Sequence, residues 1–239
     1  MRLDKFLCDS GLFSRREAAA AAKKGRITVN GAVLRDASRH IREGEDTILL
    51  DGKELAFSRF DYLWLHKPAG YVSATEDGKL PCVTDLLPPP YDRRGLFPCG
   101  RLDRDTTGLL LLTNNGQLSH RLLSPRHHVE KIYRFTCTPP LPAGAEERFA
   151  SGMTLGCEHC KPAVLRADDG RASGEITLTE GKYHQIKRMV EALGSRVITL
   201  SRISFAGIPL PPDLAPGAIR PASEEEISIL KKATEEKEK

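Results

Sequence analysis

Residues 100–116 read GRLDRDTTGLLLLTNNG, a run of four leucines between two polar segments that favour turns. Four consecutive leucines, Leu109 to Leu112, lie between turn-forming residues on both sides. A short apolar run bounded by turns is typical of a strand that is buried on both faces, since a helix usually needs ten or more residues. The sequence therefore predicts a buried strand at Leu109–Leu112, preceded and followed by polar turns.

The turn before this strand carries two carboxylates. Asp103 lies between Arg101 and Arg104, and Asp105 follows two residues later. A carboxylate at such a position can act as a nucleophile or a base, but an aspartate in a turn often does no more than cap the local backbone. Spacing alone favours the capping role and does not distinguish Asp103 from Asp105.

Hydrophobic periodicity predicts further strands and helices on both sides of this segment. Apolar or alternating stretches predict strands, and Ile186, Met189, Val190 and Leu193 have the spacing of an amphipathic helix. The expected strands are 62–66, 133–137, 175–179 and 197–205, and the expected helices are 117–124, 186–193 and one opened by a capping box at Ser223 and Glu226. Because strands and helices do not alternate strictly, we expect an α+β domain.

The first residues have a different pattern, which predicts two short helices and a hairpin. Leu3, Phe6 and Leu7 share one helix face, and Ser14–Glu17 is a capping box that opens a second helix. Asn30-Gly31 is a strong signal for a two-residue hairpin turn. Taken alone, this pattern also fits a generic helical hairpin.

The charge is concentrated in blocks. Residues 1–42 hold ten Lys/Arg against four Asp/Glu, and residues 43–56 hold one against five. Residues 100–134 hold six against three, and residues 182–202 hold five against one. Cationic blocks suggest a polyanionic partner, of which nucleic acid is the commonest, although ordinary solvated faces give the same pattern.

Several classes are disfavoured by the sequence. No apolar run approaches the roughly 20 residues of a membrane span, and Asp4 and Lys5 lie where a secretory apolar core would be. Six cysteines at irregular spacing are expected to be free thiols in a reducing compartment. Cys157 and Cys160 have zinc-like spacing but no second ligand pair follows them. We therefore expect a cytoplasmic protein without membrane contact or a bound metal.

The string RLDKFL…SGLFSRREA…GRITVNG, at residues 2–31, resembles the small RNA-binding domain named after ribosomal protein S4. The resemblance implies an S4-like domain over residues 1–57. It also implies that the second helix and the loop before it contact the RNA backbone, which makes Arg15 and Arg16 candidate phosphate ligands. Phosphate contacts position a protein on RNA without reading its bases.

GRLDRDTTGLLLLTNNG also resembles the central motif of pseudouridine synthases, and three further motifs follow in the same order. They are SPRHHVEKIYRF (124–135), GKYHQIKRM (181–189) and ITLSRISFAGIPL (198–210). Together they resemble the ribosomal small-subunit pseudouridine synthase A (RsuA) family. The resemblance implies a mixed, largely antiparallel sheet with flanking helices over residues 58–234. The charged residues 235–239 are expected to form a disordered tail. In the LHKPAGYV motif (65–72), His66 stands where this family usually has asparagine.

The resemblance assigns roles to individual residues. Asp103 matches the essential aspartate, and Tyr133 matches the tyrosine that stacks on the target base and is placed for proton transfer. Lys187 matches the basic residue that pairs with the aspartate, and Leu200 matches an apolar pocket residue. The candidate RNA-backbone ligands in this part of the chain are Arg101, Arg126 and Arg188.

The implied reaction is the isomerisation of a uridine in 16S ribosomal RNA, with uridine 516 as the expected target. It needs no metal or cofactor, and the expected partner of the monomeric enzyme is 16S rRNA or a small-subunit assembly intermediate. Everting the base costs a few kcal/mol, of which stacking on Tyr133 can offset about 1–3 kcal/mol. Because desolvation opposes a charged carboxylate, Lys187 is expected to hold Asp103 ionised. The alternatives are the same chemistry on 23S rRNA and a non-catalytic RNA-binding assembly factor.

Overall fold

The computed structural model describes residues 1–55 and 58–235. The chain divides into two compact units, Met1–Asp61 with Leu87–Leu96, and Tyr62–Leu86 with Phe97–Lys239. The domain boundary expected between residues 57 and 58 falls at the edge of the described residues. The expected disordered tail lies outside them from residue 236 on, while Glu235 is the last residue of a helix.

The first unit packs two helices against a four-stranded sheet of order β2-β1-β3-β4. Its elements are α1 (Leu3–Asp9), α2 (Arg15–Lys23), β1 (Ile27–Val29), β2 (Ala32–Val33), β3 (Ile48–Leu50) and β4 (Lys53–Glu54). Leu3, Phe6 and Leu7 are buried as predicted, together with Ile27 and Ile48. The predicted capping box is present, since the Ser14 side chain accepts from the Glu17 amide and the Glu17 side chain accepts from the Ser14 amide.

Two hairpins build this small sheet. Asn30 and Gly31 have φ values of 50° and 81°, as the predicted turn requires. Asp51 and Gly52 repeat the same geometry with φ values of 50° and 81° and join β3 to β4. The sequence analysis missed this second hairpin, although Asp-Gly is as strong a turn signal as Asn-Gly.

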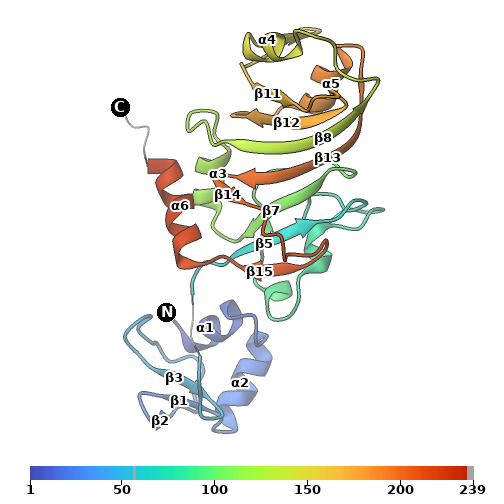
Figure 1. Ribbon diagram of the computed structural model, residues 1–239. Helices are drawn as coiled ribbons and strands as arrows, with labels where there is room; N and C mark the ends of the chain where they lie inside the picture. The colour runs from blue at the N-terminus through green and yellow to red at the C-terminus, as the bar shows by residue number, and fades with distance from the viewer. Residues whose placement is uncertain (56–57, 236–239) are drawn as a thin grey trace. The chain divides into compact units, whose positions relative to one another are not determined.

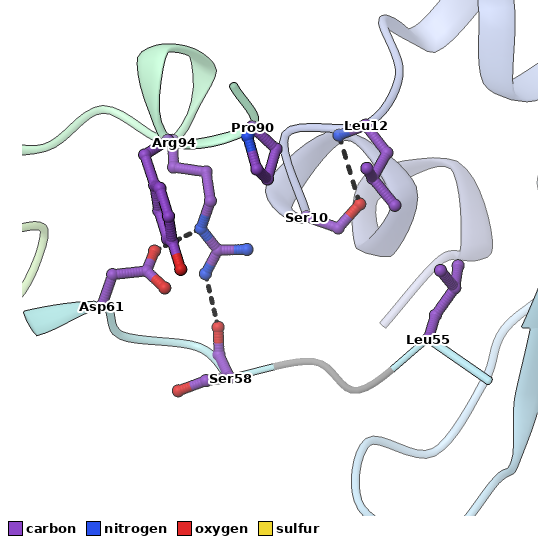
Figure 2. Close-up of a pocket in the computed structure, with 8 residues that line it drawn as sticks. Ser10, Leu12, Leu55, Ser58, Asp61, Pro90 and Arg94 are labelled. Carbon is purple, nitrogen blue, oxygen red and sulfur yellow. Dashed lines mark hydrogen bonds and ion pairs between the residues drawn. The ribbon is translucent and has the colours of Figure 1, made fainter. Parts of the chain in front are cut away.

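The proline-rich segment before residue 97 contributes to the first unit. Arg94 forms an ion pair with Asp61 and donates a hydrogen bond from Nη2 to the Ser58 carbonyl at 2.6 Å. Figure 2 shows these contacts beside a cavity of about 300 Å³. Burial raises the pKa of Asp61 above its ordinary value although Arg94 opposes the rise. The lining residues are Ser10, Leu12, Leu55, Ser58, Asp61, Pro90, Tyr91 and Arg94.

The second unit is built on a nine-stranded sheet of order β11-β12-β8-β13-β7-β5-β15, in which β14 pairs with β13 and β6 pairs with β7 (Figure 1). Its neighbours are antiparallel except for β13 and β7, which are parallel. The α+β, largely antiparallel fold expected from the sequence is confirmed. The strands are β5 (Tyr62–Lys67), β6 (Phe97–Pro98), β7 (Thr107–Thr113), β8 (Lys131–Thr138), β11 (Val164–Ala167), β12 (Ser173–Leu178), β13 (Arg196–Phe205), β14 (Ile208–Pro209) and β15 (Ile219–Pro221).

Helices and a separate hairpin accompany this sheet. The elements are the short 3-10 helices η1 (Val83–Leu86) and, in the first unit, η2 (Tyr91–Arg93), the helices α3 (Gly116–Leu123), α4 (Ala145–Ala150), α5 (Gln185–Glu191) and α6 (Glu224–Glu235), and the hairpin β9 (Met153–Leu155) with β10 (Glu158–Cys160). The predicted capping box at Ser223 and Glu226 opens α6. Within the described residues, no helix is long and apolar enough to cross a membrane.

The predicted buried strand is present as β7, and its four leucines are fully buried. It lies between β5 and β13 near the middle of the sheet. Gly108 is where β7 meets β13, and a Cβ atom at this residue would lie 2.3 Å from the Arg202 carbonyl oxygen. Its φ of 106° also disfavours any side chain. The strand therefore needs glycine at this position for close approach of two backbones.

We expect Gly108→Ala to lower the free energy of unfolding by at least about 3 kcal/mol, since backbone strain and a backbone clash add together. Urea denaturation measures the effect. Gly70→Ala is the matched control, because Gly70 has a similar φ of 95° but no atom near the position of the new Cβ. That variant should lose only about 1–2 kcal/mol. Equal losses in both variants would show that the contact with Arg202 contributes nothing.

Candidate active site

Asp103 lies in the turn that leads into β7, and the backbone before it is fixed. Ser73 Oγ donates to the Leu102 carbonyl at 2.9 Å and accepts from the Leu102 amide at 3.0 Å. Leu102 itself is buried. The Asp103 side chain remains 29% exposed, so its carboxylate is accessible while its backbone is held in place.

Lys187, in the first turn of α5, contacts both carboxylates of the turn. Its Nζ lies 3.1 Å from Asp103 Oδ2 and 2.6 Å from Asp105 Oδ1. Burial lowers the pKa of Lys187, but the hydrogen bonds to Asp105 and Asp103 outweigh burial and the pKa is raised. Burial raises the pKa of Asp105, and its bond to Lys187 more than reverses this, so that pKa is lowered. The pair expected between Lys187 and Asp103 is therefore present, with a charged ammonium.

His184 makes a second contact with Asp103 that the sequence analysis missed. Its Nε2 lies 3.5 Å from Asp103 Oδ1, and its backbone is left-handed with a φ of 46°. His184 is the residue before the first turn of α5 and Lys187 lies within that turn, so both side chains come from the same end of the helix. Asp105 also contacts Lys187 but is 73% exposed, against 29% for Asp103, so Asp103 is the more enclosed of the two carboxylates.

Leu200 lies on β13, the strand next to β7, and Tyr133 lies on β8, on the far side of β13. Tyr133 on β8 is opposite Arg202 on β13, which is in turn opposite Gly108 on β7. Because neighbouring strands are about 4.8 Å apart, the Tyr133 backbone is within about 10 Å of Gly108. Leu200 shares a face of β13 with Arg202, two residues away. Tyr133 and Leu200 are 8% and 7% exposed.

A buried lysine donates hydrogen bonds to the backbone of the turn. Lys67 is fully buried, and its ammonium donates to the carbonyls of Pro68, Arg104 and Thr106 at 3.1, 3.2 and 2.9 Å. Burial lowers its pKa to about 8, although the Asp105 and Asp103 charges oppose the shift. The sequence analysis gave Lys67 no role. In the structure Lys67 holds the backbone of the turn that carries both Asp103 and Asp105.

His66, the residue that departs from the family pattern, faces another segment. Its Nδ1 lies 2.7 Å from the Leu214 carbonyl oxygen, and its backbone carbonyl accepts from the Gly217 amide at 2.8 Å. His66 therefore attaches the loop before β15 to β5.

Two more buried cations lie beside this part of the sheet. Arg202 Nε donates to the Leu109 carbonyl at 2.7 Å, and its guanidinium lies 4.9 Å from the Phe205 ring centroid. Lys131 donates to the Val129 carbonyl at 2.8 Å. Burial, followed by repulsion from Arg202, lowers the Lys131 pKa to about 8. Arg202 thus joins β13 to β7 where these two strands run parallel.

The candidate RNA-binding arginines fall into two groups. Arg188 is bound within the protein, because its Nη1 lies 2.6 Å from Glu158 Oε2 and its Nη2 donates to the Leu155 carbonyl at 3.0 Å. It connects α5 to the β9–β10 hairpin. The other candidates are exposed and have no ion-pair partner among the described residues: Arg15, Arg16, Arg101 and Arg126.

The Cys157–Cys160 segment lies at the tip of the β9–β10 hairpin and continues into β10. In the part of the chain that the structure describes, no three His, Cys, Asp or Glu side chains are grouped as metal ligands would be.

Comparison with known proteins agrees with this organisation. A family model described as RNA pseudouridylate synthase matches residues 61–192, and one described as S4 domain matches residues 1–47. The ribosomal small subunit pseudouridine synthase A of Escherichia coli K12 is 43% identical over 233 residues, which is 96% of this chain and 100% of that protein. An uncharacterized RNA pseudouridine synthase of Bacillus subtilis 168 is 41% identical over 234 residues, covering 96% of this chain and 98% of that protein.

A solved structure gives the same result. The crystal structure of a pseudouridylate synthase matches with a TM-score of 0.68 and 36% identity, covering 96% of this chain and 99% of that one. A mixed sheet domain with this carboxylate turn, preceded by an S4 domain, defines an enzyme that modifies RNA. The chain belongs to the RNA pseudouridylate synthase family, and the resemblance to the RsuA group seen in its motifs is confirmed. It is an RNA pseudouridine synthase, which is an isomerase.

Proposed function

We propose that this enzyme converts one uridine of small-subunit ribosomal RNA into pseudouridine, with uridine 516 of 16S rRNA as the target. The observation that carries the proposal is the Asp103 carboxylate, partly exposed and 3.1 Å from the Lys187 ammonium. The relatives named as ribosomal small subunit pseudouridine synthase A, at 41–43% identity over nearly the full chain, support this choice of RNA.

Each residue of the site has a distinct task in this proposal. Asp103 attacks the nucleoside while the glycosidic bond between N1 and C1′ breaks. The uracil then rotates and its C5 bonds to C1′, while the bond that Asp103 had formed breaks and the free carboxylate is regenerated. C5 loses a proton and N1 gains one, so the product is an isomer of the substrate. Tyr133 stacks on the everted base and is placed for proton transfer, Leu200 packs in the pocket, and Lys187 is the counter-ion of Asp103.

The remaining candidates bind the RNA backbone in this proposal. Arg15, Arg16, Arg101 and Arg126 are exposed and suited to phosphate contacts. Arg188 contributes by holding the β9–β10 hairpin against α5. We further propose that the enzyme acts as a monomer in the cytoplasm on 16S rRNA or a small-subunit assembly intermediate. The six cysteines, all free thiols, fit a reducing compartment.

The proposed target is tested by mapping pseudouridines in total RNA from cells with and without this protein. We expect one modification in 16S rRNA, at uridine 516, to disappear when the protein is absent. Loss of a modification in 23S rRNA instead would support the same chemistry on the large subunit. An unchanged map of both RNAs would overturn the proposal.

The proposed docking role of the first unit predicts a change in salt dependence. Replacing both Arg15 and Arg16 by alanine should weaken binding to a 16S rRNA fragment. The slope of log K against log salt should also become shallower by about 1.4–1.8, because each of the two phosphate contacts contributes about 0.7–0.9. Filter binding across a salt series measures it. Arg26→Ala is the control, since Asp51 already pairs with Arg26 at 2.5 Å. An unchanged slope in the double variant would argue against the docking role.

A further inference from the structure

The segment that joins β12 to α5 presents an exposed aromatic ring beside the active site. Tyr183 is 74% exposed, more than any other large hydrophobic side chain that the structure describes. Burying such a ring against the protein would be favourable, yet the fold leaves it in solvent. The position of the ring is therefore set by its neighbours and not by the core.

The Tyr183 ring is stacked on His184. The two ring centroids are 3.9 Å apart, and the planes differ by 16°. His184 in turn reaches Asp103, with Nε2 3.5 Å from Oδ1. Its φ of 46° is costly for a residue other than glycine, and such local strain often accompanies a functional site. The stacked pair thus extends from the reactive carboxylate to solvent.

Hydrogen bonds fix the backbone on both sides of this pair. Lys182 Nζ donates to the His159 carbonyl at 2.6 Å, and the Lys182 amide donates to Gln185 Oε1 at 3.0 Å. The buried Gln185 also donates from Nε2 to Glu180 Oε1 at 2.7 Å. Because the segment is already ordered, a ligand that contacts Tyr183 loses little binding energy to ordering it.

The surroundings of the exposed ring favour a nucleic-acid base as its ligand. The ring lies in the chain between His184 and Lys182, whose Nζ is also 3.5 Å from Glu158 Oε1, and His184 shares Asp103 with the Lys187 ammonium. Aromatic faces combined with positive charge are typical of sites that bind single-stranded RNA, whereas an apolar protein partner would require a broader apolar surface. Everting a uridine also leaves the neighbouring base without its stacking partner.

We propose that Tyr183 and His184 form a stacking platform for the base of a nucleotide adjacent to the everted uridine. The platform rests on the proposed function in one respect, namely that an RNA uridine enters the site at Asp103. It is distinct from the stacking of Tyr133 on the target base itself, and it contributes to the affinity and to the choice of sequence context.

Binding of substrate RNA to Tyr183 variants tests the platform. Tyr183→Ala should weaken binding about tenfold or more, the usual effect of removing one stacking partner, and the loss should appear in KM while kcat is largely retained. Tyr183→Phe keeps the ring and should restore binding. Val164→Ala, at another exposed apolar residue, is the control for a general surface effect. Loss of affinity in Tyr183→Phe equal to that in Tyr183→Ala would overturn the stacking role.

A substrate lacking the adjacent base separates stacking from a structural role. RNA with an abasic nucleotide next to the target uridine should bind the wild-type enzyme as weakly as Tyr183→Ala binds normal RNA. The two changes together should cost no more than either alone, because they remove the same contact. The abasic nucleotide is placed on the 5′ side in one substrate and on the 3′ side in another. Additive losses on both sides would overturn the proposal.

The same assay distinguishes the platform from the choice of target RNA. All variants are compared with the wild-type enzyme on an RNA that the wild-type enzyme converts, whichever ribosomal subunit supplies it. If no 16S fragment is converted but a 23S fragment is, the proposed target is wrong while the Tyr183 comparison proceeds on the 23S fragment. If 16S is converted and Tyr183→Ala binds like wild type, only the platform is wrong.

Discussion

Asp103→Asn should reduce conversion of uridine to pseudouridine at least about 10³-fold, equivalent to about 4 kcal/mol of activation free energy. An amide in place of the carboxylate keeps the size of the side chain but loses the negative charge and the nucleophilic oxygen. RNA affinity should survive, because phosphate contacts elsewhere supply much of it. The fold should survive as well, since Lys187 retains its 2.6 Å contact with Asp105.

Asp105→Asn is the matched control for this variant, two residues away in the same turn. Asp105 shares Lys187 with Asp103 but is 73% exposed, so its replacement should cost less than about tenfold, near 1.4 kcal/mol. Carbodiimide labelling followed by primer extension detects the product, and filter binding measures RNA affinity. Pseudouridine made at a normal rate by Asp103→Asn, or equal losses in the two variants, would contradict the assignment of Asp103.

Much of the fold could be predicted because its signals are local. The capping boxes at Ser14 and Ser223 and the turn at Asn30-Gly31 each act over a few residues. The apolar run of β7 is bounded on both sides by turn-forming residues, which are also a local signal. The structure adds short elements such as α4, whose six residues are too few for periodicity to identify.

The active site could be predicted only in part, because its partners come from distant segments. Spacing did not separate Asp103 from Asp105, and Lys187 touches both. The resemblance to the family singled out Asp103. In the structure the two carboxylates differ in their exposure and in the contact of Asp103 with His184, which depend on how α5 packs beside the turn. Lys67 was missed for a related reason. A lysine in a strand pattern is expected to face solvent, and only the assembled turn supplies the three carbonyls that bind its ammonium.

Replacing Lys187 by methionine should leave a folded protein whose conversion rate is at least about 100-fold lower, near 2.7 kcal/mol. Methionine has a similar length and can pack against the same stem contacts, but it removes the cation from Asp103 and Asp105. Both carboxylates would then lose the ammonium that they share, and the negative charge of Asp103 would be stabilised less. Circular dichroism and urea denaturation verify the fold, and single-turnover kinetics measure the rate.

Two further variants show whether charge or geometry accounts for the loss. Lys187→Arg keeps the positive charge but replaces a compact ammonium by a planar guanidinium, so its rate should lie between those of the wild-type enzyme and Lys187→Met. Lys232→Met removes an exposed lysine from α6 and should not change the rate. Near-normal turnover by Lys187→Met would remove the proposed role, because Asp103 would then react without the ammonium 3.1 Å away. Loss in Lys187→Arg equal to that in Lys187→Met would instead show that the shape of the cation matters as much as its charge.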